Sequence, residues 1–91
     1  MGNLFIGANT GIQVTIDAYG AIERQLPPQL VLDYPTEILV GDVLDQISQQ
    51  YPQAEKALER CACAIGEDII PRQTTLKHDC TLVLLSPVAG G

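Results

Sequence analysis

Alternation of apolar and polar residues predicts two β-strands in the first third of the chain. Apolar side chains occupy every second position over residues 12–19, which places them on one face of a strand. Residues 30–34 alternate in the same way, and Pro35 ends the run. We expect residues 20–28 to form a loop, because a pair of prolines closes this segment. Two consecutive strands joined by a loop favour an antiparallel hairpin.

A change of period predicts an amphipathic helix over residues 40–51. The apolar positions with the spacing i, i+3, i+4, i+7 are Val40, Val43, Leu44, Ile47 and Tyr51. Asp42 and Asp45 lie near the expected N-terminus, where the helix dipole favours carboxylates. Pro52 marks the end of this helix, and the apolar residues of segment 54–58 predict a short second helical piece.

The second half of the chain returns to short extended segments. We predict strands over residues 61–65 and 80–86, a short extended piece at residues 69–70, and a polar loop over residues 73–79. A hairpin, a crossover helix and returning strands indicate an α+β domain, in which one mixed sheet of about four to five strands packs on a main helix.

The last strand is apolar on both faces. Leu82 and Leu84 point to one face, and Val83 and Leu85 point to the other. A single helix covers only one face of such a sheet, so the second face is either buried by another element or exposed as a partner surface. The position of this strand next to the C-terminal segment favours the partner surface.

Composition limits the classes of function. The 91 residues suffice for one domain, with a loose leader over residues 1–11 and a folded part over residues 12–91. The net charge of −6 and only five basic residues argue against nucleic-acid binding. No apolar run approaches the roughly 20 residues of a membrane span, and no secretory signal is recognisable. The three cysteines are expected to stay reduced in the cytoplasm.

The sequence gives little support for a zinc site or for a hydrolase active site within the chain itself. Cys61, Cys63, His78 and Cys80 are four potential zinc ligands, but the Cys-x-Cys spacing departs from the usual pattern. We therefore interpret the cysteines as small buried hydrophobic residues and predict no metal site. No nucleophile has a histidine and an acid at a recognisable spacing, so a hydrolase is not expected.

The C-terminal segment is the clearest functional signal. Residues 87–91 directly follow an apolar strand and end in Gly90-Gly91. A terminal glycine carboxylate has no side chain to obstruct attack, and five residues reach at most about 17 Å. This pattern predicts a narrow tail whose carboxylate enters a partner's active site; a simple frayed terminus is the alternative.

A family resemblance follows from these features. The element order, the size and the ending Leu84-Leu85-Ser86-Pro87-Val88-Ala89-Gly90-Gly91 resemble the ubiquitin-like β-grasp sulfur carriers. Within them, residues 12–91 are most similar to the small subunit of molybdopterin synthase, whose tail commonly reads Pro-Pro-Val-Xaa-Gly-Gly. Ser86 replaces the first of these prolines. Residues 19–24 also resemble the family's Phe-Gly-Xaa-Leu-Arg-Glu segment. Carriers that serve thiazole (thiamine) or cysteine synthesis end similarly and remain open alternatives.

The resemblance implies a role for the tail. A ubiquitin-activating-like adenylyltransferase would use ATP and Mg²⁺ to adenylate Gly91, and a sulfur donor would convert it to a thiocarboxylate. The tail, formed by Pro87, Val88, Ala89 and Gly90, would then carry the sulfur into the large subunit of molybdopterin synthase, where it attacks a pterin precursor. The chain itself would bind no cofactor and would not be catalytic alone.

The same resemblance implies a docking surface near the end of the last strand. It would involve Leu84 and Leu85, to which the apolar second face of the strand adds Val83. We predict Leu85 as the exposed contact because strand parity leaves only one of the two leucines exposed. Two other functions stay open: a ubiquitin-like modifier joined through Gly91 to a lysine, and an interaction module in which Gly-Gly is incidental.

Overall fold

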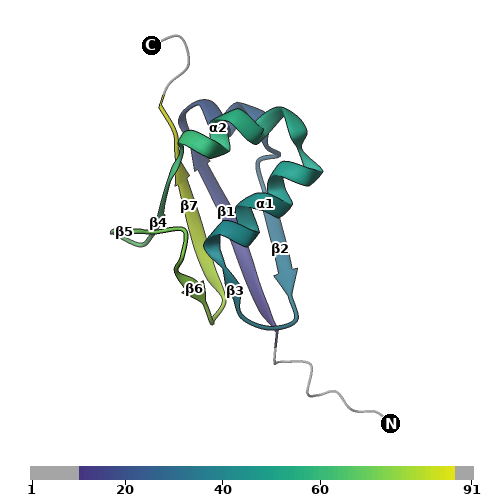
Figure 1. The fold of residues 1–91 in the computed structure, drawn as a ribbon, viewed down its shortest axis with the longest axis vertical. Helices are drawn as coiled ribbons and strands as arrows, with labels where there is room; N and C mark the ends of the chain where they lie inside the picture. The colour runs from purple at the N-terminus through teal and green to yellow at the C-terminus, as the bar shows by residue number, and fades with distance from the viewer. Residues whose placement is uncertain (1–10, 88–91) are drawn as a thin grey trace.

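The first and last strands of the fold pair side by side in the middle of a five-stranded mixed sheet (Figure 1). The computed structural model describes residues 11–87, so most of the predicted leader and residues 88–91 lie outside the described part. The strands, in their order across the sheet, are β2 (Leu30–Tyr34), β1 (Ile12–Tyr19), β7 (Cys80–Leu85), β4 (Ala62–Ile65) and β5 (Asp68–Ile70). Strands β1 and β7 run parallel, and the other neighbours are antiparallel.

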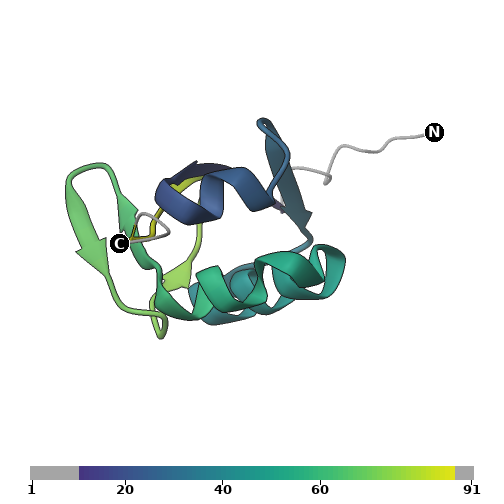
Figure 2. The same ribbon diagram turned by 90° about the horizontal axis from the view of Figure 1, so that it is seen from above.

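A parallel pair needs a crossover connection, and helices supply it here. Helix α1 (Val40–Gln50), the short 3₁₀ segment η3 (Pro52–Ala54) and helix α2 (Glu55–Arg60) follow one another between β2 and β4. Figures 1 and 2 show α1 and α2 lying across one face of the curved sheet. No helix within residues 11–87 is long and apolar enough to span a membrane.

The core lies between these helices and the sheet. The largest fully buried side chains come from both layers and are Ile22, Ile47, Leu82, Leu84, Val14, Val40 and Val43. The predicted apolar stripe of α1 is therefore confirmed, and Tyr51 packs against the same core from just beyond the helix. The helix ends at Gln50 because Tyr51 precedes Pro52, and a residue before proline avoids helical dihedral angles.

The predicted strands and both helical pieces are present, but two segments expected to be loops are more regular. Gly20–Gln25 forms the 3₁₀ helix η2, which buries Ile22 completely. Within the predicted polar loop 73–79, Thr75–Leu76 forms strand β6, which pairs with β3 (Ile38–Leu39). Leu76 is buried in the core, and this burial stabilises a two-residue pairing that no sequence period could reveal.

A matched pair of isoleucine substitutions tests this core. Ile47→Ala removes a fully buried side chain from α1 and should lower the free energy of unfolding by about 2–5 kcal/mol. Ile69→Ala, at a position that is 66% exposed, should change the free energy of unfolding by less than about 0.5 kcal/mol. Urea denaturation of both variants measures the difference, and equal losses would contradict the assigned core.

Candidate functional site

Strand β7 divides its apolar residues between the two faces of the sheet. Leu82 and Leu84 are fully buried on the helical side, whereas Val83 is half-buried and Leu85 is 39% exposed on the other side. Leu84 was expected to share the docking surface, but its position in the core removes it from any surface. The geometry leaves Val83 and Leu85 as the accessible part of that predicted interface.

The strand register places residues of three further strands on the same face as Val83 and Leu85. Val83 lies between Asp17 of β1 and Ala64 of β4, and Ala64 in turn pairs with Ile69 of β5. Directly paired residues share a face of the sheet. Leu85 lies beside Tyr19, which is 49% exposed. We call the surface formed by Tyr19, Ile69, Val83 and Leu85 the sheet patch; the register and alternation along β7 place it on the face opposite the buried Leu82 and Leu84, and so opposite α1 and α2.

The described chain leaves the sheet next to this patch and is held there by η2. The Ser86 N–H donates to the Tyr19 carbonyl at 3.0 Å, and the Ile22 N–H donates to the Ser86 hydroxyl at 2.7 Å. The Ala21 N–H donates to the Pro87 carbonyl at 3.2 Å. Pro87, predicted as the first tail residue, is thus attached to the domain, and Val88, Ala89, Gly90 and Gly91 lie outside the described residues.

A hollow of about 270 Å³ lies beside this exit. Its walls include Asp17, Ala18, Tyr19 and Glu23, and prolines 27 and 28 contribute apolar surface. The Tyr19 hydroxyl donates a 2.9 Å hydrogen bond to the Asp17 carboxylate, and this bond, together with the negative charges of Asp17 and Glu23, raises the pKa of Tyr19. No pattern in the sequence links Asp17 to Glu23, because acidic residues scattered along a chain carry no spacing signal, and Tyr19 was noted only within the family-like segment 19–24.

The cysteines form a pair and a separate single residue. Cys61 and Cys63 are both buried in the core, whereas Cys80 lies at the far end of β7, where it pairs with Val14 of β1. This separation follows from the antiparallel pairing of β4 with β7. Within residues 11–87, no three His, Cys, Asp or Glu side chains are arranged to hold a metal ion.

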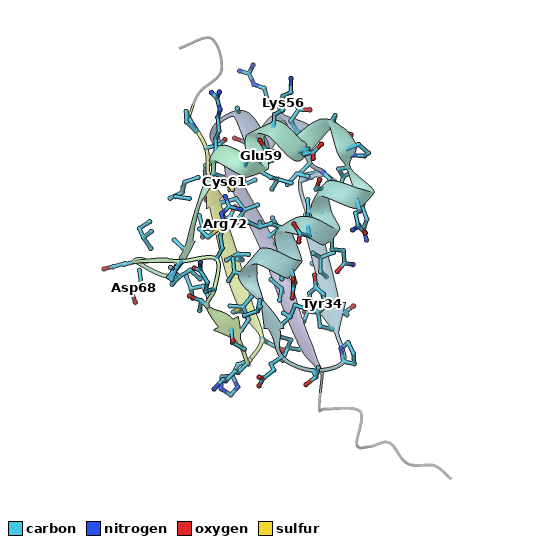
Figure 3. The ribbon with its side chains drawn as sticks, in the orientation of Figure 1. Tyr34, Lys56, Glu59, Cys61, Asp68 and Arg72 are labelled. Carbon is cyan, nitrogen blue, oxygen red and sulfur yellow. The ribbon has the colours of Figure 1, made fainter. Side chains whose placement is uncertain are left out.

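Arg72 reaches the cysteine pair from the loop before β6 (Figure 3). Its guanidinium donates to the carbonyls of Leu58 and Cys61 at 2.8 and 2.9 Å, so it binds the C-terminal end of α2. A hydrogen bond from the Cys63 thiol, helped by the positive charge of Arg72, lowers the pKa of Cys61 to about 7. The same pairing with Cys61, followed by burial, raises the pKa of Cys63.

Substitution of Cys63, the hydrogen-bond donor to Cys61, tests whether the lowered pKa belongs to Cys61. In the wild-type chain, one thiol should ionise near pH 7, and Cys63→Ala should raise that pKa because Cys61 loses its hydrogen-bond donor. Since the folded pKa lies below the unfolded one, the contribution of the Cys61 thiolate to stability should grow as pH rises from about 7 to about 8.5. Ultraviolet thiolate absorbance follows the titration. The control Cys80→Ala should leave the low transition in place, and its loss there would contradict the assignment to Cys61.

Comparison with known proteins places this geometry in a family. The molybdopterin synthase sulfur carrier subunit of Mycobacterium tuberculosis (strain ATCC 25618 / H37Rv) is 27% identical over 82 residues, covering 88% of this chain and 99% of that protein. The complex of subunits 1 and 2 of molybdopterin-converting factor from Helicobacter pylori 26695 contains a similar chain, with a TM-score of 0.59, 25% identity, and coverage of 87% and 99%.

Structural likeness without close sequence similarity supports the same fold. SAMP1 from Haloferax volcanii superposes with a TM-score of 0.72 at 16% identity, covering 87% of this chain and 99% of that one. The predicted ubiquitin-like β-grasp fold is therefore confirmed. The model of the ThiS family matches residues 19–91, which is most of the described domain together with its C-terminal end. The chain therefore belongs to the ThiS family of ubiquitin-like β-grasp sulfur carriers.

Proposed function

We propose that this chain carries sulfur as a thiocarboxylate on Gly91 and delivers it as the small subunit of molybdopterin synthase. The observation that carries the proposal is the exit of the chain at Pro87 beside an exposed apolar surface, two residues before a terminal Gly-Gly. The likeness to the sulfur carrier subunit from M. tuberculosis, over almost its whole length, supports this choice of pathway.

The proposed chemistry begins with an unreactive group. A terminal carboxylate is ionised at neutral pH and is a poor acyl donor. A ubiquitin-activating-like adenylyltransferase, which supplies ATP and Mg²⁺, joins one carboxylate oxygen of Gly91 to the α-phosphorus and releases pyrophosphate. Hydrosulfide supplied by a sulfur donor then attacks the acyl carbon and displaces AMP, with no change of oxidation state at sulfur. The resulting thiocarboxylate is nucleophilic at neutral pH and transfers its sulfur to a pterin precursor in the large subunit.

The sheet patch is the proposed contact with these partners. An apolar surface next to the exit of the tail would hold the domain in place while residues 88–91 enter an active site. The related complex from H. pylori, by its name, joins two subunits of molybdopterin-converting factor, which supports a large subunit as partner. The thiols of Cys61, Cys63 and Cys80 are free, and we place this exchange in the cytoplasm, where thiols stay reduced.

Carriers of the same family differ in the acceptor of the sulfur. The match to the ThiS family keeps sulfur delivery to thiazole synthesis as a second candidate, and cysteine synthesis remains an alternative acceptor. A ubiquitin-like modifier would use the same activated Gly91 but would form an isopeptide bond with a lysine. These outcomes differ in the product, because only the modifier leaves lysine adducts on other proteins.

Deletion of Gly91 tests the reactive residue. The wild-type chain, incubated with the adenylyltransferase, ATP, Mg²⁺ and a sulfur source, should gain the mass expected when one oxygen is replaced by one sulfur. The deletion variant should gain none, although its thermal unfolding should be unchanged because every residue of the described fold is retained. Intact mass spectrometry measures both, and wild-type loading of the variant would exclude Gly91 as the site.

A pair of leucines with nearly equal exposure tests the docking surface. Leu85→Asp places a charge in the sheet patch and should weaken binding to the large subunit by at least about tenfold, which corresponds to about 1.4 kcal/mol. Leu39 is 41% exposed, against 39% for Leu85, but it lies in β3 at the other end of the domain (Figure 1). Leu39→Asp should therefore leave the affinity unchanged. Calorimetric titration compares the variants, and similar losses for both would refute the surface.

A further inference from the structure

The junction between η2 and the end of β7 contains more hydrogen bonds than the termination of a strand requires. The Tyr19 carbonyl accepts from the Ser86 N–H at 3.0 Å and from the Ser86 hydroxyl at 3.3 Å. The same hydroxyl accepts from the Ile22 N–H at 2.7 Å, and Pro87 accepts from the Ala21 N–H. We call this group of bonds, which joins residues 19–22 to Ser86 and Pro87, the exit clamp.

The exit clamp replaces a missing helix cap. The first N–H groups of a helix have no partner inside it, and a side chain at the N-cap usually satisfies one of them. Tyr19 is the N-cap of η2 and makes no such bond. Ser86, which is 64 residues from Ile22 in the sequence, supplies the acceptor instead. The start of η2 and the exit of the chain therefore hold each other in place.

Gly20 makes this close approach possible. Its φ of +86° lies in the left-handed region, where residues with a side chain are strained. A Cβ at this position would lie 1.9 Å from the Ser86 carbonyl oxygen and 2.9 Å from the Ser86 carbonyl carbon. Backbone atoms at such distances have to move, so any side chain at position 20 would displace the exiting chain.

The clamp also determines the last point at which the described chain is attached before Gly91. Pro87 has no N–H and cannot continue the strand ladder, so the bonds of Ser86 and the Pro87 carbonyl are the last attachments among the described residues. Four residues follow, and they reach at most about 14 Å. With so short a connection, the position of the exit determines which active sites the terminal carboxylate can reach.

We propose that Ser86 and Gly20 are positioning residues for the reaction at Gly91. Their contacts hold the backbone at Ser86 and Pro87 in the required geometry before a partner binds. This inference rests on the proposed sulfur-carrier function and adds to it a reason for the serine that replaces the proline common in the family. Releasing Ser86 would require one more residue to be ordered on binding, at a cost of about 5- to 30-fold in affinity.

The proposal predicts that the effect of Ser86→Ala on affinity depends on whether residues 88–91 are present. The affinity of the adenylyltransferase that loads the wild-type chain is measured for wild type and Ser86→Ala. Each chain is tested in two lengths, complete and ending at Pro87, and both lengths retain every described residue. A positioning role predicts that Ser86→Ala weakens binding about 5- to 30-fold in the complete chain and less than about twofold in the shortened one. Ser86→Thr, which keeps the hydroxyl, should restore the affinity.

Several results would overturn the proposal. Equal losses in both lengths would show that Ser86 supports the domain rather than the tail. An unchanged affinity of complete Ser86→Ala, or a failure of Ser86→Thr to restore it, would remove the positioning role. Gly20→Ala should reproduce the loss if it folds, and the serine variants decide the question if it does not. Absence of sulfur loading in the wild-type chain would instead overturn the proposed function itself, and this inference with it.

Discussion

The parallel pairing of β1 with β7 is the constraint on which the other features of this domain depend. Six residue pairs, from Val14 with Cys80 to Tyr19 with Leu85, join the first strand to the last. Because parallel neighbours cannot be joined by a tight turn, the intervening chain has to cross the sheet. It does so with α1 and α2 on one face, and this crossing creates the only large apolar core of the described residues.

The same pairing separates the core from the surface of β7. With the helices on one side, alternate residues bury Leu82 and Leu84 and leave Val83 and Leu85 on the other face. The neighbours of β7 on both sides then determine the composition of the sheet patch, since Tyr19 comes from β1 and Ile69 lies beyond β4. An apolar surface that no element of the described chain covers is thereby placed at the end of the domain where the chain leaves the sheet.

The pairing of β1 with β7 also explains why several hydrogen bonds hold Ser86 and Pro87. Strand β1 is followed directly by η2, so the end of β7 arrives beside backbone N–H groups that η2 leaves without partners. One serine hydroxyl serves both as the cap of η2 and as an attachment for the chain. On the other side of β7, Arg72 likewise has two contacts: it binds the carbonyls at the end of α2 and lies close to the Cys61–Cys63 pair.

The sequence by itself determined the strands and the main helix, and it singled out the terminal Gly-Gly for the proposed chemistry. Strands β1 and β2 and helix α1 each carry their own hydrophobic period, and Pro35 and Pro52 mark the ends locally. The fold class followed from the order of these elements, and the terminal Gly-Gly indicated a tail that acts on a partner. The tertiary structure alone decided the rest. Ile22 and Leu76 lie in segments without an apolar period, and contacts with distant strands and helices bury them.

The exit clamp is also a feature that only the tertiary structure decided. Nothing in the sequence indicates that Gly20 and Ser86 touch, because a turn glycine and a serine before proline are common in any chain. Their significance arises when the register of β1 and β7 brings the Ser86 carbonyl to within 1.9 Å of the position of a Cβ on residue 20. Periodicity reports which face of an element is apolar, whereas a contact between residues 66 positions apart exists only once the sheet has formed.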